Sequence, residues 1–139
     1  CRKNELQSYV TFLGSRNDVP NLLKQSDAFI YYTEYDTFGI AVVEAMAGDI
    51  PVFVNDWDVM KEISNNGELV TIYDSNNLND LVEKFIHFTQ HTAEYRAKSS
   101  KAKLYTETNF SINTYMSKLK KVYCNLIKQS KNNYCNVQN

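Results

Sequence analysis

Short apolar runs alternate with segments of helical pattern along the first half of the chain, and this alternation most strongly constrains the fold. Four runs rich in β-branched and aromatic residues are bounded by turn formers and are predicted to be strands, at residues 9–13, 28–33, 51–54 and 68–73. Helices are predicted between and after them, at residues 19–25, 38–47, 58–63 and from about residue 75 onward. Strands joined by helices through short connections form parallel sheets with helices on both faces. We therefore predict an α/β fold with a doubly wound, Rossmann-like parallel sheet.

The composition changes once along the chain and indicates two parts. Residues 9–73 hold all 4 glycines and both prolines, whereas residues 75–139 hold neither. In the second part, apolar residues recur at helical spacing over residues 78–86, and again after Ser111 at Ile112, Tyr115, Met116, Leu119, Val122, Tyr123, Leu126 and Ile127. We predict a partial Rossmann-like domain over residues 1–90 and a C-terminal helical extension over residues 91–139.

The charge balance and hydropathy exclude two classes of protein. Lys and Arg number 15 against 16 Asp and Glu, which gives a net charge of −1. Binding to nucleic acid through overall charge is therefore excluded. The chain has no run of about 18 apolar residues, the length that spans a membrane.

The cysteines and histidines do not form a recognisable metal or disulfide pattern. Cys1, Cys124 and Cys135 are odd in number and include no C-x-x-C pair, which favours a reducing, cytoplasmic location. His87 and His91 lie four residues apart on a predicted helix, but no third ligand is near in sequence, so no metal site is predicted. The chain opens with Cys rather than Met, and we expect it to be part of a longer protein.

The segment from Asp36 to Gly48 carries the most chemical information. Between Thr37 and Gly48 its one charged residue is Glu44, in a helix that is otherwise apolar on every side and is expected to be buried on most of them. A carboxylate in such surroundings needs a partner. Glu44 either pairs with a structural cation at the edge of the helix or binds a ligand.

The predicted position of this helix favours a ligand. It follows a strand, so its N-terminus opens at the carboxyl edge of the sheet, where Gly39 lets a ligand approach the backbone. We expect the free amides of Phe38, Gly39 and Ile40 to form an anion site there. Thr37 and Glu44 lie two turns apart on one face, which places Glu44 about 10 Å from that site. This spacing suits a nucleotide sugar, with its phosphates at one end and its hydroxyls further along.

The same residues resemble a family signature. Asp36-Thr37-Phe38-Gly39-Ile40, Glu44-Ala45-Met46-Ala47, Gly48 and Pro51-Val52 are similar to the motif E-x-F-G-x-x-x-x-E-A-M-A-x-G-x-P-V of retaining glycosyltransferases of the GT-B fold, family 4. Further similarities lie at residues 10–18, 26–29 and 61–63, so the resemblance covers roughly residues 9–88. It implies that the chain is the truncated C-terminal half of such an enzyme, with a nucleotide-sugar-binding domain over residues 1–90.

The resemblance also implies roles for individual residues. Glu44 would bind the ribose hydroxyls and Asp36 the transferred sugar, while Thr37 and the turn at Phe38, Gly39 and Ile40 would face the sugar and diphosphate. Arg16 lies on a loop edge from which it would contact the nucleotide. The donor is then a substrate, the anomeric configuration is retained, and neither a cofactor nor an obligatory metal is expected. The acceptor, a sugar or a lipid-linked glycan, would be bound by an N-terminal domain outside this chain, in polysaccharide or glycoconjugate biosynthesis.

Departures from the signature keep a second interpretation open. Asp36 stands where the motif has Glu, the usual Gly-Gly pair is replaced by the bulkier Asp56-Trp57-Asp58, and the family's first two strands with their Arg and Lys pair have no counterpart here. The chain is therefore expected to be an inactive enzyme fragment by itself. The alternative is a non-catalytic nucleotide-sugar-binding or interaction module on the same fold.

The last predicted helix has a basic outer face. Its lysines are Lys118, Lys120, Lys121, Lys128 and Lys131. Such a face is either solvated or in contact with anionic lipid. Peripheral contact with the inner face of the membrane is one expectation for this helix.

Overall fold

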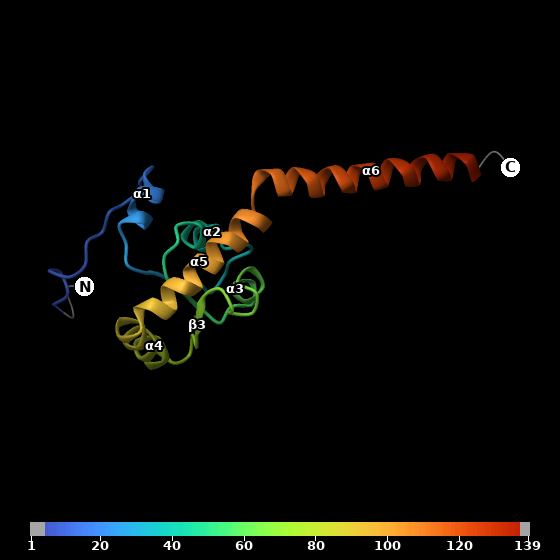
Figure 1. The fold of residues 1–139 in the computed structure, drawn as a ribbon. Coiled ribbons are helices and arrows are strands. Elements are labelled where there is room, and N and C mark those ends of the chain that lie inside the picture. The colour runs from blue at the N-terminus through green and yellow to red at the C-terminus, as the bar shows by residue number, and fades with distance from the viewer. Residues whose placement is uncertain (1–4, 137–139) are drawn as a thin grey trace.

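The computed structural model of this chain describes residues 5–136, with side-chain surroundings given through residue 129. Its sheet contains β1 (Phe29–Tyr31), β2 (Val52–Asn55) and β3 (Thr71–Tyr73), all parallel and in that spatial order. The helices of the described part are α1 (Val19–Lys24), α2 (Ile40–Ala47), α3 (Asp58–Ile63), α4 (Leu78–Gln90), α5 (Thr92–Asn109) and α6 (Ile112–Asn136). Figure 1 shows α2, α3, α4 and α5 grouped around the sheet, with α6 extending away from them.

The central strand β2 is buried along its whole length, because helices cover both faces of the sheet. On one face Val52 and Val54 join a core with residues of α1, α2, α3 and α5. On the other face Phe53 contacts Phe88 of α4 and Tyr95 of α5, with ring centroids 5.8 Å apart in both pairs. The doubly wound parallel arrangement predicted from the sequence is confirmed.

Helix α5 runs back across the domain and packs on α2 (Figure 1). Its buried positions follow helical spacing, at Tyr95, Ser99, Ala102 and Thr106. The hydroxyls of Ser99 and Thr106 each donate to a carbonyl one turn back in the same helix, at 2.8 Å, so neither polar group is left without a partner. The boundary predicted between residues 90 and 91 stays a prediction, but α5 contributes directly to the core that contains β2.

The strand predicted at residues 9–13 is wrong. These residues pair with no strand of the described chain, and Tyr9 and Phe12 are each 84% exposed. The amides of Tyr9 and Val10 instead donate to the carbonyl of Leu6. An apolar parallel strand needs helices over both of its faces, and the described residues ahead of α1 supply none.

The first residues of the helices agree with the sequence prediction in some cases and differ from it in others. Helix α3 occupies the predicted residues 58–63, and α4 begins after Asn77, whose side chain accepts from the amide of Asn79. Asp18 precedes α1, but its side chain makes no capping bond. Helix α2 begins at Ile40 rather than Phe38, because Gly39 has a positive φ of 77° that no α-helix accommodates.

Helix α6 extends away from the rest of the domain (Figure 1). Most of its apolar residues are more than half exposed, from Ile112 at 70% to Met116, Val122 and Leu126 at 54% each. The predicted helical spacing is therefore correct, but the described residues do not bury the apolar face. Among the described residues, no helix combines the length and apolarity needed to cross a membrane.

Replacing Phe53 by Ala should destabilise the domain strongly. Its ring is fully buried between β2, α4 and α5, so truncation would leave a cavity and lower the free energy of unfolding by about 3–5 kcal/mol. Chemical denaturation followed by circular dichroism measures the change. As the control, Leu104→Ala at a 66% exposed position of α5 should stay within about 0.5 kcal/mol of the wild type. A loss below about 1 kcal/mol for Phe53→Ala would contradict this account of the core.

Candidate functional site

The three strands end at one edge of the sheet, and the loops that leave this edge carry the polar residues of the candidate site. The loop after β1 holds Asp36, the loop after β2 holds Asp56, and the loop after β3 holds Asp74 and Ser75. The carboxyl edge of a parallel sheet is where doubly wound folds bind ligands. The loops after all three strands therefore bring polar residues to the edge where a ligand would be expected.

Asp36 accepts hydrogen bonds that hold the loop after β1. Its Oδ2 accepts from the Tyr31 hydroxyl at 2.7 Å, and its Oδ1 accepts from the amides of Phe38 and Gly39, both at 2.9 Å. These bonds hold the pKa of Asp36 below its ordinary value, the Phe38 amide acting most strongly, followed by the Tyr31 hydroxyl and the Gly39 amide. The same contact raises the pKa of Tyr31, because ionisation of the phenol would place two negative charges together.

The anion site expected at Phe38, Gly39 and Ile40 is therefore not free as predicted. Asp36 already occupies the amides of Phe38 and Gly39, an arrangement that its short side chain allows. Within the described residues, the amides of Ile40 and Ala41 have no acceptor, and they lie at the N-terminal end of α2. The Asp36 carboxylate thus accepts from two of the three amides that were expected to bind an anion.

Gly39 packs closely against α3. It is buried, and a Cβ added there would lie 3.0 Å from Met60 Cε and 3.1 Å from Ile63 Cδ1, both on α3. Together with the positive φ, this close approach explains why glycine occupies the position. The Cβ side of Gly39 is therefore filled by α3, and approach of a ligand to its backbone stays a prediction.

Glu44 lies on the outward face of α2 and is exposed. The expectation of a helix buried on most sides fails here, because only Val42, Ala45 and Met46 of α2 are buried. Within the described residues Glu44 makes no ion pair and no side-chain hydrogen bond, so it is not locked against a structural cation. It borders two surface hollows, one shared with α1 and one shared with Phe38, Ile40, Asn109, Phe110, Tyr115 and Lys118.

The other predicted residues divide between the site and the periphery. Thr37 is exposed and precedes α2, so the argument that it shares a helix face with Glu44 does not apply. Phe38 is 45% exposed with its ring edge-on to Phe110, and Ile40 is 65% exposed.

Arg16 pairs with Asp18 through two contacts of 2.7 and 2.6 Å, which raises the pKa of Arg16 and lowers that of Asp18. That pairing explains why Asp18 does not cap α1.

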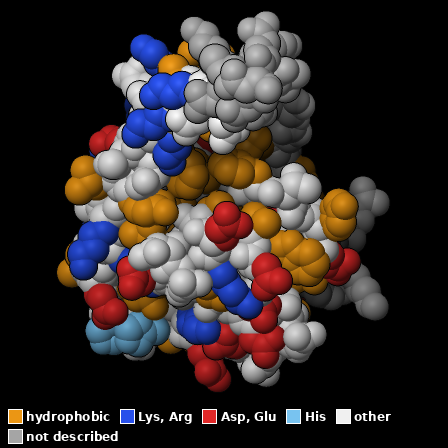
Figure 2. Space-filling view, turned by 90° about the vertical axis from the view of Figure 1, so that its right-hand side faces the viewer, with side chains coloured by type: hydrophobic (Ala, Val, Ile, Leu, Met, Phe, Trp, Pro, Cys, Tyr) orange, Lys and Arg blue, Asp and Glu red, His pale blue; other side chains and the backbone are white. Residues whose placement is uncertain are grey.

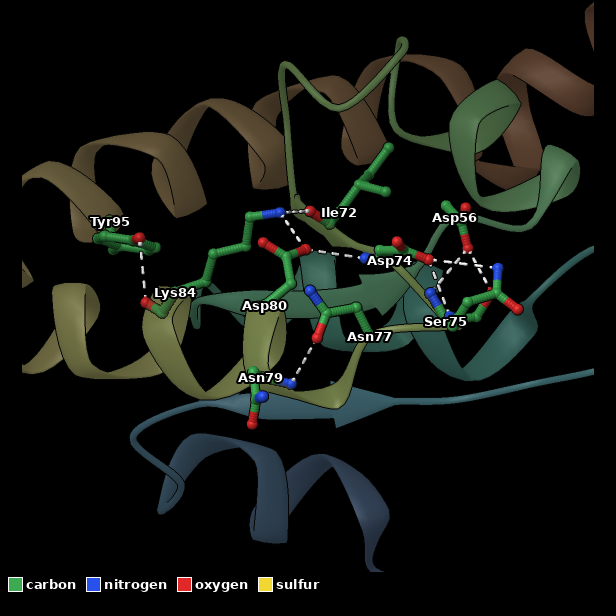
Figure 3. A network of polar contacts seen from close by, with 10 residues as sticks. Asp56, Ile72, Asp74, Ser75, Asn77, Asn79, Asp80, Lys84 and Tyr95 are labelled. Carbon is green, nitrogen blue, oxygen red and sulfur yellow. Dashed lines mark hydrogen bonds and ion pairs between the residues drawn. The ribbon is translucent and has the colours of Figure 1, made fainter.

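A second polar network joins the loops after β2 and β3, and sequence reasoning did not identify it as such (Figure 3). Asp56 Oδ1 accepts from the amide and the hydroxyl of Ser75, at 3.1 and 2.7 Å, and these contacts lower the pKa of Asp56. Lys84 donates to the carbonyl of Ile72 and to Asp80, which in turn accepts from the amide of Asp74. The sequence signal that could have identified this network is an Asp directly after a buried strand.

The described part of the chain contains no cluster of three His, Cys, Asp or Glu residues suited to a metal ion.

The titration of Asp36 should depend on Tyr31. We expect the Asp36 carboxyl to titrate below the ordinary aspartate pKa of 3.8, so its contribution to stability is present at neutral pH and is lost as the pH falls through that lowered value. Tyr31→Phe removes the hydroxyl donor and should raise the pKa of Asp36. Carbon-detected NMR of the side-chain carboxyl measures it. Tyr32→Phe is the matched control, because the Tyr32 hydroxyl donates to Glu34 instead, and an equal shift in both variants would contradict the assignment.

Comparison with known proteins assigns this chain to a family. Residues 1–104 match the family described as "Glycosyl transferases group 1". The O-antigen chain mannosyltransferase RfbU of Salmonella typhimurium is 33% identical over 101 residues, which cover 66% of this chain and 29% of that protein. The lipopolysaccharide core biosynthesis mannosyltransferase LpsB of Rhizobium meliloti is 25% identical over 91% of this chain and 36% of its own length. The chain thus spans about a third of the curated relatives it matches.

Solved structures confirm the fold class as the α/β arrangement of GT-B glycosyltransferases. HepE of Anabaena, solved in complex with UDP and glucose, has a TM-score of 0.82 and 21% identity, and the match covers 89% of this chain and 34% of that one. A glycosyltransferase from Rickettsia africae has a TM-score of 0.83 and 24% identity, with 91% and 34% covered. Because the family match spans residues 1–104 of the 139, this chain belongs to the group 1 glycosyl transferase family.

Proposed function

We propose that this chain is the donor-binding part of a retaining glycosyltransferase of family 4, which transfers a sugar from a nucleotide sugar to an acceptor hydroxyl. The observation that carries the proposal is the placement of the two signature acids. Asp36 lies at the carboxyl edge of the sheet, and Glu44 lies on the exposed face of the helix that begins beside it, with no partner among the described residues. A free carboxylate there is available to a ligand that approaches the N-terminal end of α2.

Glu44 is proposed to bind the ribose of the donor. A carboxylate accepts two hydrogen bonds from neighbouring hydroxyls, as acidic residues do for riboses in other doubly wound folds. The diphosphate would lie near Ile40, whose amide has no acceptor among the described residues and where the helix dipole favours negative charge. Thr37 is exposed at the same end of the helix and would face the sugar.

Asp36 is proposed to contact the transferred sugar while holding its loop. An ionised carboxylate offers about four acceptor positions. The Tyr31 hydroxyl and the amides of Phe38 and Gly39 use three of them. The position that remains suits one sugar hydroxyl. Arg16 would contact the nucleotide only after releasing Asp18.

The transfer exchanges one bond to the anomeric carbon for another. The bond from that carbon to the diphosphate oxygen breaks, the acceptor oxygen bonds to the same face, and the acceptor's hydroxyl proton passes to the departing diphosphate. Donors at the start of α2 would stabilise the charge that develops on the diphosphate. Neither a cofactor nor an obligatory metal is part of this proposal.

The names of the relatives support a role in polysaccharide or glycoconjugate biosynthesis. Those proteins are named for O-antigen chain and lipopolysaccharide core mannosyl transfer, and one from Escherichia coli for galactosyl transfer to a diphosphoundecaprenol-linked sugar. We infer an acceptor of the same class, a sugar or a lipid-linked glycan, bound outside this chain. Weak or no catalysis is expected of the 139 residues alone.

A non-catalytic nucleotide-sugar-binding or interaction module is the second candidate. The three hydrogen bonds that Asp36 accepts favour it, because they give this residue a structural task that needs no substrate. Donor binding without transfer, in a protein completed to the length of its relatives, would support the module over the enzyme.

Removing the charge of Glu44 should weaken nucleotide binding. Calorimetric titration of the chain with UDP and with GDP should give binding by at least one of them, and Glu44→Gln should weaken it about tenfold or more, since bonds to a charged acceptor are lost. Glu83→Gln, at an exposed position of α4, should bind like the wild type. Equal affinity in the Glu44→Gln variant would contradict the ribose assignment, and no binding at about 1 mM of either nucleotide would contradict the donor site itself.

Peripheral contact of α6 with the inner face of the membrane is also part of the proposal. Four lysines of this helix, Lys118, Lys120, Lys121 and Lys128, are exposed, and the sequence of α6 contains no Asp or Glu. Figure 2 looks toward the end of α6 and shows Lys and Arg side chains gathered at the top of the view, above a band of hydrophobic ones. Basic helices with an exposed apolar face bind anionic lipid surfaces.

Vesicle flotation tests this contact. The chain should float with vesicles containing phosphatidylglycerol and not with pure phosphatidylcholine, and added salt should reduce binding because the attraction is electrostatic. Lys118→Gln with Lys121→Gln should weaken binding, whereas Lys24→Gln with Lys101→Gln, two exposed lysines of the domain body, should not. Binding that ignores lipid charge would contradict the proposal.

A further inference from the structure

The chain leaving β1 toward Asp36 is held by a buried side-chain amide that lies outside the family signature of residues 36–52. Asn55, the last residue of β2, is 2% exposed. Its Oδ1 accepts from the amide of Thr33 at 3.0 Å, and its Nδ2 donates to the carbonyl of the same residue at 2.8 Å. One side chain therefore satisfies both backbone groups of a residue 22 positions earlier in the sequence.

The register of the sheet explains why a side chain is needed there. Backbone pairing between β1 and β2 stops at Tyr31 and Val54, whereas β2 continues to pair with β3 through Asn55 and Tyr73. Beyond the last backbone pair between β1 and β2, the side-chain amide of Asn55 bonds to the chain that leaves β1. Tyr73, which is 1% exposed, holds the end of β1, because its hydroxyl donates to the carbonyl of Tyr31 at 3.0 Å.

These contacts form a chain that ends at the candidate site. Tyr73 fixes residue 31, Asn55 fixes residue 33, and the Tyr31 hydroxyl then holds Asp36, which orders the amides of Phe38 and Gly39. The rest of β2 is Val, Phe and Val, so an apolar residue would satisfy packing at position 55. A buried amide is costly unless it is bonded, and its two partners here both belong to the loop that carries Asp36.

We propose that Asn55 is a positioning residue of the donor site, which sets the loop of residues 32–39 through its two bonds to Thr33. The inference rests on the proposed function, since it assigns Asn55 to the placement of Asp36 and the start of α2. It also makes a claim about loop order that is measurable without any substrate.

Amide hydrogen exchange, read by NMR on the labelled chain, reports this order residue by residue. In the wild type the amides of Phe38 and Gly39 should be protected, because both donate to Asp36. Asn55→Ala leaves Thr33 without these partners and should speed exchange at Phe38 and Gly39 about tenfold, the effect of losing roughly one hydrogen bond. Protection in α4, at Phe88, should be unchanged.

Asn55→Asp provides a rescue controlled by pH. A protonated carboxyl donates to the Thr33 carbonyl and accepts from its amide as Asn does, whereas an ionised one can only accept. Burial raises the pKa of such a carboxyl, so exchange relative to the wild type at the same pH should be normal at acid pH and faster above that pKa, over about pH 5 to 8. Asn79→Asp, exposed at the start of α4, is the matched control and should show no such change.

The outcomes separate this inference from the proposed function. Unchanged protection at Phe38 and Gly39 in Asn55→Ala, or loss of protection in α4 together with the loop in Asn55→Asp, would overturn the positioning role. Faster loop exchange with undiminished UDP or GDP binding would overturn its connection to the donor. A wild type that binds neither nucleotide would overturn the proposed function, while the exchange result would still decide whether Asn55 orders the loop.

Discussion

The candidate site depends on the hydrogen bonds that the carboxylate of Asp36 accepts. This carboxylate joins the end of β1, through Tyr31, to the start of α2, through the amides of Phe38 and Gly39. A negative charge is favourable beside the N-terminal end of a helix. Because this contact uses two of the amides ahead of α2, the same residue that shapes the site also limits which amides remain free for a ligand.

The short central strand β2 connects the core with the site. Its first three residues supply apolar side chains to both faces of the sheet. Its last residue, Asn55, and Asp56, which follows the strand, bond to the loops on either side of it. A parallel strand covered by two layers of helices has little freedom to shift. The polar groups at its carboxyl end are therefore held in place by the packing of the sheet.

Much of the fold could be predicted because its signals are local. The runs that became β1, β2 and β3 are short, apolar and bounded by turn formers, and α3 begins and ends where its residues predicted. Alternation of such elements leaves few topologies other than a doubly wound parallel sheet. The family signature around Asp36 and Glu44 was equally visible, since it depends on residue types and spacing alone.

The sequence by itself determined the order of the elements, the parallel sheet and the pair of acids that mark the family. Only the tertiary structure decided that residues 9–13 form no strand, that Gly39 faces α3, that Glu44 is exposed and that Arg16 pairs with Asp18. It also brought Asn55 to Thr33 across 22 residues. The physical reason is that periodicity and motifs record what each segment prefers locally, whereas burial and hydrogen-bond partners depend on which segments the folded chain places side by side.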